Sequence, residues 1–474
     1  MIDGWEIVIG LEVHTELLTA TKLFSGSPNE FGGTPNTHID PTSLGLPGSL
    51  PVLNKQAVEL AIRAGLALNC EVQRSTFARK NYFYPDMPKD FQISQFDQPI
   101  NGEGWLELPT GKRIGIERAH LEEDTGKSTH ATADGAGGGR IHDAQYSLVD
   151  YNRAGVPLLE IVGRPDLRSA DEAKAYVTEL RSILIAVGAS DGKMEEGSLR
   201  VDCNVSVRRD GDDELGTRCE IKNVNSLRSM GRAIDYEAAR QVDLITAGER
   251  IRQETRHWNE DDGRTATLRS KEEATDYRYF PEPDLVELDP DEAWIESVRA
   301  ALPVLPRERR AALVDATGAP AVTAALIVER ALDQLVLDAI AAGGDPQRVL
   351  THAEHNLADA RATEISPGSF AALATLESSG DLTATQAKAV IAHMVEHGGE
   401  PAAIAEELGF ESVDTGELEG IVDGLIAANQ DEWAKFCDGE NKVMGFFVGQ
   451  VMKATGGNAD GKAVSALLNQ RKNG

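Results

Sequence analysis

The chain has 474 residues, which is too long for one ordinary hydrophobic core, so two to four domains are expected. Hydrophobic residues make up 41%, enough for a folded protein, and no run approaches the roughly 20 apolar residues of a membrane helix. The formal net charge of -30 disfavours a nucleic-acid binder without excluding one, because an acidic protein can still carry one basic surface.

The N-terminus and the cysteines indicate a cytoplasmic protein. The first residues show no basic segment followed by an apolar run, so no secretory signal is expected. The four cysteines are scattered without a C-x-x-C pair. This pattern argues against a disulfide framework and against a cysteine zinc site.

The first region, residues 1–293, predicts a mostly antiparallel sheet. Short β-type runs are separated by turns rich in Gly, Pro and Asn, and they lie at residues 6–9, 113–116, 158–162 and 200–207. One helix is expected near Asn54 and another at Ser169, which is paired with Glu172 in a capping box. Strands and helices do not alternate regularly, so the fold class is α+β. The glycine-rich run at 135–139 predicts a mobile insertion.

The rest of the chain predicts helices. Beyond residue 293 the composition shifts to Ala, Leu and charged residues, which indicates a helical domain over 294–405. A small helical tail domain is expected over 406–474. Its cations make the tail locally more basic than the acidic whole.

Glu12 and His14 lie two residues apart in a β-type run, so both side chains point from one face of a strand, followed by Glu16. Carboxylates and imidazole on one face can bind a hard cation. A solvated polar strand face explains the same spacing and is the favoured interpretation of this segment by itself, because such spacing arises easily.

Further acids strengthen the cation hypothesis. Residues 122–124 are three consecutive acids, and two more acids at 195–196 precede Asp202 on a strand. Glu160 interrupts the apolar run at 157–162, where a charge is costly unless it is paired or coordinated. A buried ion pair with Arg164 is the alternative.

Cations accompany these acids. Residues 79–89 interleave Arg and Lys with aromatic rings, which suits phosphate binding or base stacking. Lys127, Arg200 and Lys222 are further candidates to neutralise phosphate. The Thr-Gly-Lys-Ser run at 125–128 is not a P-loop, because Leu121 stands where its first glycine is needed. No nucleophile motif stands out.

Taken in order, these segments resemble the B subunit of the aspartyl/glutamyl-tRNA amidotransferase. The resemblance spans the whole chain, and its long motifs recur in the same order. The matching segments are residues 8–14 (VIGLEVH), 79–86 (RKNYFYPD), 92–99 (QISQFDQP), 122–128 (EEDTGKS), 150–157 (DYNRAGVP), 193–200 (KMEEGSLR) and 276–284 (DYRYFPEPD).

The resemblance implies a catalytic cradle domain (1–293), a helical domain (294–405) and a tRNA-binding tail (406–474). It implies a heterotrimer with an amidase A subunit, which hydrolyses glutamine, and a small C subunit. The cognate non-discriminating aminoacyl-tRNA synthetase is a further possible partner. With ATP and Mg²⁺, the side-chain carboxylate of Glu-tRNA(Gln) or Asp-tRNA(Asn) is phosphorylated, and ammonia displaces the phosphate. Mg²⁺ offsets the repulsion between ATP and the carboxylate.

The resemblance also implies roles for individual residues. The expected roles are metal binding by Glu12, His14, Glu123, Glu160, Asp202 and Glu220; catalysis by Glu12, His14, Glu123, Lys80 and Lys89; ATP binding by Lys127, Arg200 and Lys222; and tRNA binding by Lys442, Lys453 and Lys462. Lys80 and Lys89 are expected at the phosphate site or at the mouth of an ammonia channel.

The chain departs from the family in one loop. Many members carry a four-cysteine zinc knot there, and the corresponding positions in this chain are Ser25, Ser27, Asp40 and Ser43. Hydroxyls and one carboxylate do not replace four thiolates as structural zinc ligands. No zinc is therefore expected, and the loop should be held by packing and hydrogen bonds.

Two other functions use the same residues. One is an ATP-dependent carboxylate–amine ligase acting on a free small molecule, and the other is a non-catalytic tRNA-binding scaffold. The sequence does not decide which misacylated tRNA is used, how the metal is coordinated or where ammonia travels.

Overall fold

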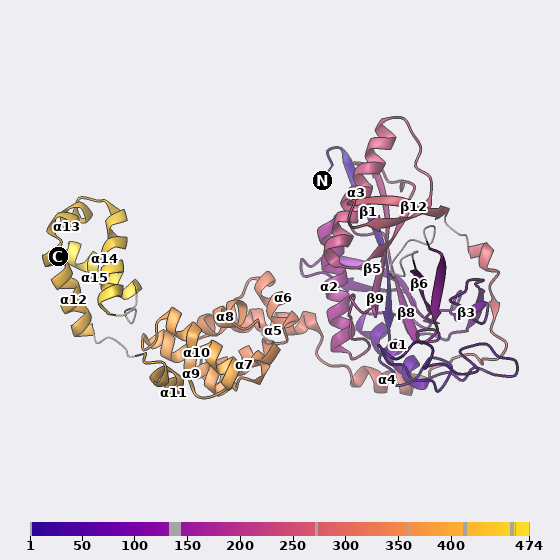
Figure 1. Cartoon of the computed structure of the whole chain (residues 1–474), viewed down its shortest axis with the longest axis horizontal. Coiled ribbons are helices and arrows are strands. Elements are labelled where there is room, and N and C mark those ends of the chain that lie inside the picture. The colour runs from indigo at the N-terminus through magenta and orange to yellow at the C-terminus, as the bar shows by residue number, and fades with distance from the viewer. Residues whose placement is uncertain are drawn as a thin grey trace. The chain divides into compact units, whose positions relative to one another are not determined.

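The computed structural model describes residues 2–131, 144–270, 274–358, 360–410, 415–455, 459 and 461–473. The glycine-rich run at 135–139, predicted to be mobile, lies outside the described residues. The chain forms two compact units, residues 1–306 and 307–474. The first combines a large sheet with helices and the second is helical (Figure 1), so the α+β prediction is confirmed.

An 11-stranded sheet organises the first unit, in the order β12-β11-β10-β9-β1-β8-β5-β3-β2-β13, with β4 paired to β5. Neighbouring strands run antiparallel except β10 and β11, which are parallel. The strands of this sheet are β1 (Trp5–Glu16), β2 (Ala78–Asn81), β3 (Phe91–Ser94), β4 (Gly104–Glu107), β5 (Arg113–Glu123), β8 (Pro157–Gly163), β9 (Leu199–Arg209), β10 (Cys219–Val224), β11 (Glu254–Asn259), β12 (Arg264–Ser270) and β13 (Phe280–Pro281).

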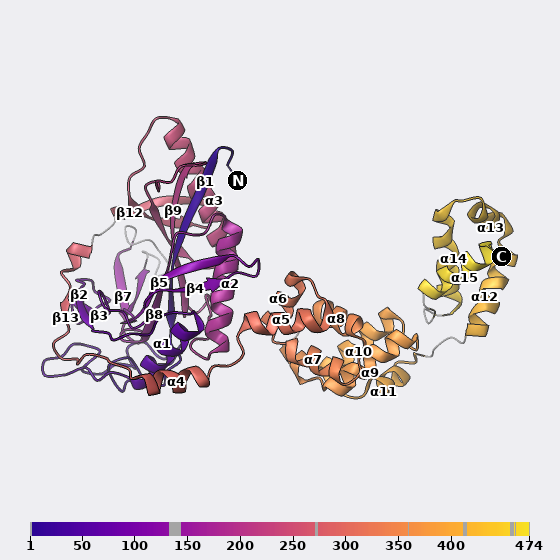
Figure 2. The same ribbon diagram turned by 180° about the vertical axis from the view of Figure 1, so that it is seen from behind.

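The central strand β1 shows why the sheet has one apolar and one polar face. Its odd-numbered residues from Trp5 to Val13 are apolar and belong to the buried core. Glu12, His14 and Glu16 alternate with them and point from the other face. Helices α1 (Lys55–Ala67), α2 (Ala170–Ala186) and α3 (Leu227–Thr246) pack against the apolar face (Figures 1 and 2). The polar face is therefore left to form a site.

The two expected helices begin where the sequence indicates. The Asn54 side chain caps α1 by accepting from the backbone N–H groups of the first turn, and Ser169 caps α2 by accepting from Glu172 N. The second half of the predicted capping box is wrong. The Glu172 carboxylate accepts from Arg168 N at 2.8 Å and from Lys112 Nζ at 2.7 Å, because this ion pair draws it away from the Ser169 backbone.

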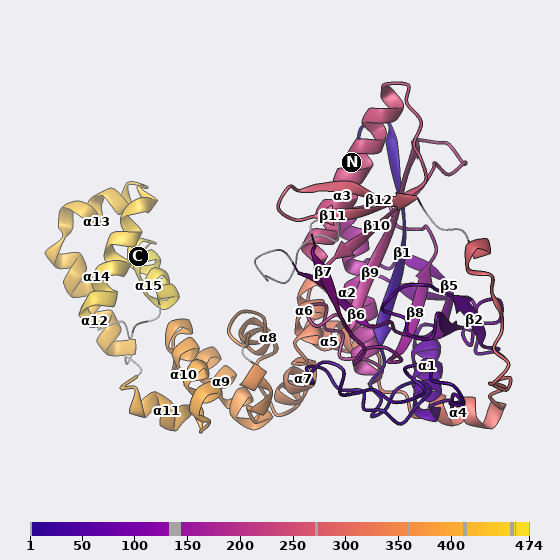
Figure 3. The same ribbon diagram turned by 45° about the vertical axis from the view of Figure 1, so that its right-hand side comes forward.

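Helix α4 (Glu292–Ala300) belongs to the first unit, although the change in composition beyond residue 293 indicated a helical domain that begins at residue 294. Its Ile295 and Val298 are buried in the first core, and the helix packs against α1. The boundary of the first unit therefore falls at residue 306 rather than 293. The remaining elements of this unit are the two-stranded sheet of β6 (Lys127–Ala131) and β7 (Tyr146–Asp150), which Figure 3 shows, and the short helix η2 (Ala274–Tyr277).

The second unit contains two separate hydrophobic cores in its described part. One is formed by residues from Leu313 to Ala405 and the other by residues from Leu418 to Leu468. Its elements are α5 (Pro306–Thr317), α6 (Ala321–Glu329), α7 (Asp333–Ala341), α8 (Pro346–His355), η3 (Ala360–Glu364), α9 (Pro367–Ser379), α10 (Ala384–His397), α11 (Pro401–Glu407), α12 (Thr415–Ala428), α13 (Gln430–Cys437), η4 (Asn441–Val443), α14 (Met444–Ala454) and α15 (Gly461–Asn473). None of the helices in the described ranges combines the length and apolar character needed to cross a bilayer.

Candidate active site on the polar face of the sheet

A row of ionisable side chains crosses the polar face of the sheet on adjacent strands. Glu160 on β8 is the direct cross-strand neighbour of both His14 on β1 and His120 on β5. On the other side of β1, Glu12 is opposite Asp202 on β9. Side chains at directly opposite positions of an antiparallel pair share one face. The register of four strands therefore gathers residues that are far apart in the sequence.

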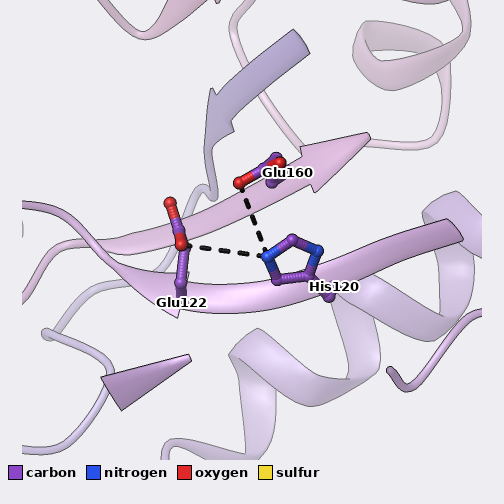
Figure 4. A group of neighbouring side chains, drawn as sticks. All are labelled: His120, Glu122 and Glu160. Carbon is purple, nitrogen blue, oxygen red and sulfur yellow. Dashed lines mark ion pairs between the residues drawn. The ribbon is translucent and has the colours of Figure 1, made fainter. Parts of the chain in front are cut away.

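The first cluster consists of His120, Glu122 and Glu160 (Figure 4). The Nε2 atom of His120 lies 3.5 Å from a Glu160 carboxylate oxygen and 3.8 Å from one of Glu122. His14 Nε2 approaches the same Glu160 oxygen at 3.9 Å. Burial opposes ionisation of Glu122, but the His120 contact and the positive charge of Lys80 outweigh it and lower the Glu122 pKa. The Glu122 carboxylate is therefore held in its ionised form.

The histidines of this cluster have unused nitrogen atoms. Both ring nitrogens of His14 and the Nδ1 atom of His120 are buried and have no hydrogen-bond partner among the described residues. Buried polar atoms are nearly always satisfied in folded proteins, so orphaned ones point to a bound ligand or ion. The buried imidazole nitrogens thus lie where an additional partner can be accommodated.

The second cluster consists of Glu12, Asp202 and Glu220, and it already contains a cation. Lys222 Nζ donates to Asp202 at 2.6 Å and lies 3.6 Å from Glu220. Burial alone lowers the pKa of Lys222, but the charges of Asp202 and Glu220 outweigh burial and raise it. The Lys222 ammonium group therefore stays charged and balances part of the acidic cluster.

Both clusters open into one cavity of about 300 Å³. Two cations that make no part of either cluster, Lys80 and Arg118, also line it. The remaining lining residues are polar or aromatic: Ser94, Gln95, Phe96, Thr255, Tyr277 and Tyr279. The cavity thus combines carboxylates, imidazoles, cations and aromatic rings in one space.

The donor set fits Mg²⁺. In each cluster the candidate ligand atoms lie within 4.8 Å of one another. Carboxylate oxygens are the ligands that Mg²⁺ prefers. Among the residues that the structure describes, no lysine forms an ion pair with the cluster of His120, Glu122 and Glu160, whereas Lys222 neutralises part of the other cluster. The first cluster is therefore the better place for a divalent cation.

The structure brings together most of the residues selected from the sequence. Six of the expected site residues line the cavity: Glu12, His14, Lys80, Glu160, Glu220 and Lys222. Asp202 joins them through its hydrogen bond from Lys222. The alternative partner of Glu160 is wrong, because Arg164 pairs with Glu103.

Glu123 and Lys89 lie elsewhere. Glu123 follows Glu122 on β5 and therefore points to the opposite face, where Lys89 forms a buried ion pair with it. The Glu123 carboxylate also accepts from Ile93 N at 2.9 Å. Neither residue lines the cavity. Their geometry is that of a closed internal ion pair.

Two expected phosphate-binding residues also lie outside the cavity. Lys127 is exposed on β6, and Arg200 donates to Asp124 at 2.6 Å. Glu16 lies beside that ion pair, where burial, reinforced by the charge of Asp124, raises its pKa to about 7. Arg200 is thus committed to a neighbouring acidic group rather than open to phosphate.

Sequence reasoning missed His120 and Glu122, although the signal was available. Within β5, Leu121 is buried in the apolar core. Glu123 lies two residues further along the strand, so its side chain points to the same face of the sheet as that of Leu121. His120 and Glu122 occupy the alternate positions of the strand, so their side chains point to the polar face. A predicted strand that ran from residue 113 to residue 123, instead of ending at 116, would have identified Glu122 rather than Glu123 as the candidate metal ligand.

The loop that contains Ser25, Ser27, Asp40 and Ser43 is held by hydrogen bonds. The Ser25 and Ser43 hydroxyl oxygens are 3.5 Å apart, and Asp40 accepts from Ser43 N at 2.7 Å. Lys22 is almost fully buried beside the loop and donates to the carbonyl oxygens of His38 (2.6 Å) and Tyr151 (3.3 Å). A buried ammonium group thus joins the loop to the segment after β7.

The expected tRNA-binding lysines are on the helices of the second unit. Lys442 in η4 and Lys453 near the end of α14 are exposed. Lys462 is on α15, but its side chain lies outside what the structure describes. The nearby Lys472 donates to Phe436 O at 2.7 Å, so it serves packing within the tail.

Comparisons with known proteins agree along the whole chain. Residues 7–296 match the family model described as the GatB/GatE catalytic domain, and residues 346–471 match the one described as the GatB domain. The chain is 47% identical to the B subunit of the aspartyl/glutamyl-tRNA(Asn/Gln) amidotransferase of Anaeromyxobacter sp. (strain Fw109-5), with 100% of both chains covered. The proteins of the same name from Salinispora arenicola and Brevibacillus brevis are 49% and 45% identical over 99% of this chain and 97% and 99% of theirs. The chain therefore belongs to the GatB/GatE family of amidotransferase B subunits.

Proposed function

We propose that this chain carries out the ATP-dependent transamidation of Glu-tRNA(Gln), Asp-tRNA(Asn) or both, at the cavity on the polar face of its sheet. A carboxylate oxygen of the aminoacyl side chain attacks the γ-phosphorus of ATP, and ADP leaves. Ammonia then attacks the carbonyl carbon of the acyl phosphate, and inorganic phosphate leaves with loss of one proton. The product is the amide, Gln-tRNA or Asn-tRNA.

One observation supports this proposal most directly. The cavity places two carboxylate clusters and the cations Lys80, Arg118 and Lys222 around one space. Transfer of phosphate to a carboxylate brings negatively charged groups together, so its site needs positive charge around them. We assign the binding of Mg²⁺ to His120, Glu122 and Glu160, with His14 beside them. A bound Mg²⁺ would supply Lewis-acid neutralisation of the phosphate oxygens.

The other side chains have supporting roles. Lys80 and Arg118 would face the phosphates, and Lys222 would hold Glu12, Asp202 and Glu220 in place or exchange with a second cation. Lys127 and Arg200 lie outside the cavity, so we do not assign them to ATP. Lys89 and Glu123 keep a structural assignment as an ion pair.

The relatives are named as one subunit of an amidotransferase, which supports work in a complex. The proposed partners are an amidase A subunit, which releases ammonia from glutamine, and a small C subunit, with the cognate aminoacyl-tRNA synthetase as a further partner. A cytoplasmic location agrees with the four cysteines, which are all free. We also propose that the loop at Ser25, Ser27, Asp40 and Ser43 binds no structural zinc; one tightly bound zinc per purified chain, by elemental analysis, would contradict this.

Replacing single carboxylates in the reconstituted complex tests the activity. Glu122→Gln and Glu12→Ala should lower ATP-dependent amidation by roughly 100-fold, because each removes charge needed at the reacting groups. Glutamine hydrolysis and tRNA binding should persist. Glu117→Gln, an exposed carboxylate on the same strand outside the cavity, is the matched control.

The same assay separates the competing functions. Unchanged amidation by Glu122→Gln and Glu12→Ala would rule out chemistry at this cavity and favour a scaffold. Amidation of free glutamate or aspartate at the rate seen with aminoacyl-tRNA would favour a small-molecule ligase. Assaying Glu-tRNA(Gln) and Asp-tRNA(Asn) side by side then identifies the substrate.

Charge reversal tests the tail. The double variant Lys442→Glu/Lys453→Glu should weaken tRNA binding and reduce the slope of its salt dependence, because phosphate contacts release counterions. Truncation before residue 406 should do the same while sparing ATP chemistry. Lys388→Glu, at an exposed lysine of α10, is the control. Unchanged tRNA affinity in the double variant would show that these two tail lysines do not bind tRNA.

A further inference from the structure

The cavity is lined by a stacked pair of aromatic rings from two segments that are far apart in the chain. Phe96 lies just after β3, and Tyr279 lies between η2 and β13. Their ring centroids are 4.1 Å apart and their planes differ by 9°. Both rings line the cavity, yet the Phe96 side chain remains 47% exposed. Tyr279 covers one face of Phe96 and leaves the other face without a stacked ring among the described residues.

The turn that carries Tyr279 is fixed in place by hydrogen bonds. Asn81 Nδ2 donates to the carbonyl oxygens of Tyr277 (2.8 Å) and Arg278 (3.0 Å). Arg278 between the two tyrosines has φ 45°, a conformation that is unfavourable for a residue with a side chain. The contacts of Asn81 hold this turn, and Tyr277 and Tyr279 consequently both reach the cavity. The ring pair is thus formed in advance of any ligand.

An unsatisfied donor belongs to Gln95, which precedes Phe96 in the chain and lines the same cavity. The Oε1 atom of Gln95 accepts from Leu121 N (3.0 Å) and Ile100 N (3.1 Å), which fixes its amide group. Its Nε2 atom is buried and has no hydrogen-bond partner among the described residues, and Gln95 lines the cavity. A buried donor that is held in one orientation without a partner indicates a ligand acceptor in the cavity.

The charges around the rings specify the kind of ligand. Lys80 lies with its Nζ atom 4.7 Å from the Tyr277 ring centroid, and Arg118 lines the same cavity. A flat apolar ring surface, a fixed amide donor and cations within one cavity match a base, its hydrogen-bonding groups and its phosphates. A purely apolar ligand would leave the donor and both cations without a role.

We infer that the exposed face of Phe96 is a stacking platform for an adenine ring, and that the Gln95 amide donates to the same nucleoside. This inference rests on the proposed function. That reaction supplies adenine from two sources, ATP and the 3′-terminal adenosine of tRNA. Stacking on an aromatic ring needs only the π face of the base, and the amide donor orients it.

The test measures binding to the full chain with Phe96→Leu, which keeps the apolar volume but removes the flat ring. The probes are Mg-ATP, inorganic tripolyphosphate, and two RNA oligonucleotides that differ only in ending in CCA or CC. Phe96→Leu should weaken one of the two adenine-bearing probes by about tenfold and leave tripolyphosphate and the CC-ended RNA unchanged. The probe that is weakened identifies the source of the adenine.

Two variants control this experiment. Phe83→Leu removes an aromatic ring that is 64% exposed in the neighbouring segment but does not line the cavity, and it should change no affinity. Phe96→Trp retains a flat ring and should restore adenine binding. Equal affinities of wild type and Phe96→Leu for both adenine probes would overturn the inference, as would an equal loss for tripolyphosphate. The proposed function is tested separately: if the Glu122→Gln variant keeps its amidation activity, the proposed function is wrong, and this result does not depend on the binding properties of the Phe96 variants.

Discussion

Adjacent residues on one strand have opposite environments in this protein. Glu122 and Glu123 differ by one position on β5, yet Glu122 belongs to the cavity and Glu123 to a closed ion pair with Lys89. The period-two alternation of a strand produces this difference. The family motif contains both acids, so only their direction separates a candidate ligand from a structural charge.

Removing Lys89 should destabilise the protein strongly. Lys89→Met leaves the Glu123 carboxylate buried without its counter-ion, and breaking such a pair costs about 3–5 kcal/mol. The double variant Lys89→Met/Glu123→Gln should recover much of this loss, because both charges of the pair are then removed together. Urea unfolding of both variants measures the difference. A Lys89→Met protein as stable as wild type would contradict the structural assignment of the pair.

Lys22 should make stability depend on pH in the alkaline range. Burial lowers the pKa of Lys22 to about 8 from its ordinary value of 10.5. Between these values the unfolded chain binds the proton more readily than the folded protein, so this group makes the protein more stable as pH rises. The penalty for charging Lys22 is complete below about pH 8 and vanishes above its ordinary pKa.

The comparison with Lys22→Met isolates that effect. The unfolding free energy of wild type minus that of the variant should increase between pH 8 and 10, with a limiting slope of about 1.4 kcal/mol per pH unit. Urea unfolding at pH 7.5, 8.5 and 9.5 gives the slope, and other titrating groups cancel in the difference. A pH-independent difference would show that the folded-state pKa is not lowered.

Among the elements, helix α1 is positioned by a close approach that only glycine permits. A Cβ atom added to Gly65 would lie 1.9 Å from Asn101 Oδ1. Asn101 is fully buried and donates through Nδ2 to Ala61 O of the same helix at 3.0 Å. Its backbone also pairs with Ala119 in β5. The asparagine therefore cannot move aside, and the glycine sets the distance between helix and sheet.

Gly65→Ala should consequently destabilise the protein despite its higher helix propensity. The propensity gain is about 1 kcal/mol, whereas overpacking at a rigid buried contact costs about 1–3 kcal/mol or more. Gly449→Ala on α14 is the matched control, since nothing lies within 4 Å of the added Cβ, and it should stabilise its own unit. Thermal unfolding should show that Gly65→Ala lowers the unfolding temperature and Gly449→Ala raises it. Equal increases in both variants would show that Asn101 moves to make room for the added methyl group.

For the molecule as a whole, the position of α4 decides where the chain can be divided. All residues that line the cavity lie in the first unit, which extends to residue 306. Its α4 buries Ile295 and Val298 in the same core as the central sheet. The helical character of residues 294–305 therefore does not assign them to the helical unit.

Two fragments test this boundary. Fragment 1–306 should fold and bind Mg-ATP within about twofold of the full chain if the cavity is the nucleotide site. Fragment 1–293 should be less stable by about 3–6 kcal/mol, because it loses the burial of Ile295 and Val298 at roughly 1.5–3 kcal/mol each. If the two fragments unfold at the same urea concentration, residues 294–306 do not stabilise the first unit, and its boundary lies at residue 293.

Patterns along the chain were sufficient to predict the fold class, the polar face of β1, the two capped helices and the family. Each of these predictions depends on local periodicity, on a short capping pattern or on long motifs, all of which can be identified from the sequence alone. The same patterns selected a set of charged residues that the structure places beside one another, although no single segment shows how they meet. This set consists of Glu12, His14, Glu160, Asp202, Glu220, Lys80 and Lys222.

Which of these residues face one another depends on the three-dimensional packing. The register of β5 against β8 places His120 and Glu122 beside Glu160, and it turns Glu123 toward Lys89. The pairing of Phe96 with Tyr279 joins segments separated by more than a hundred residues in sequence, so no local pattern reports it. Strand register and long-range packing depend on the burial of the whole sheet, and a one-residue shift would exchange the two faces.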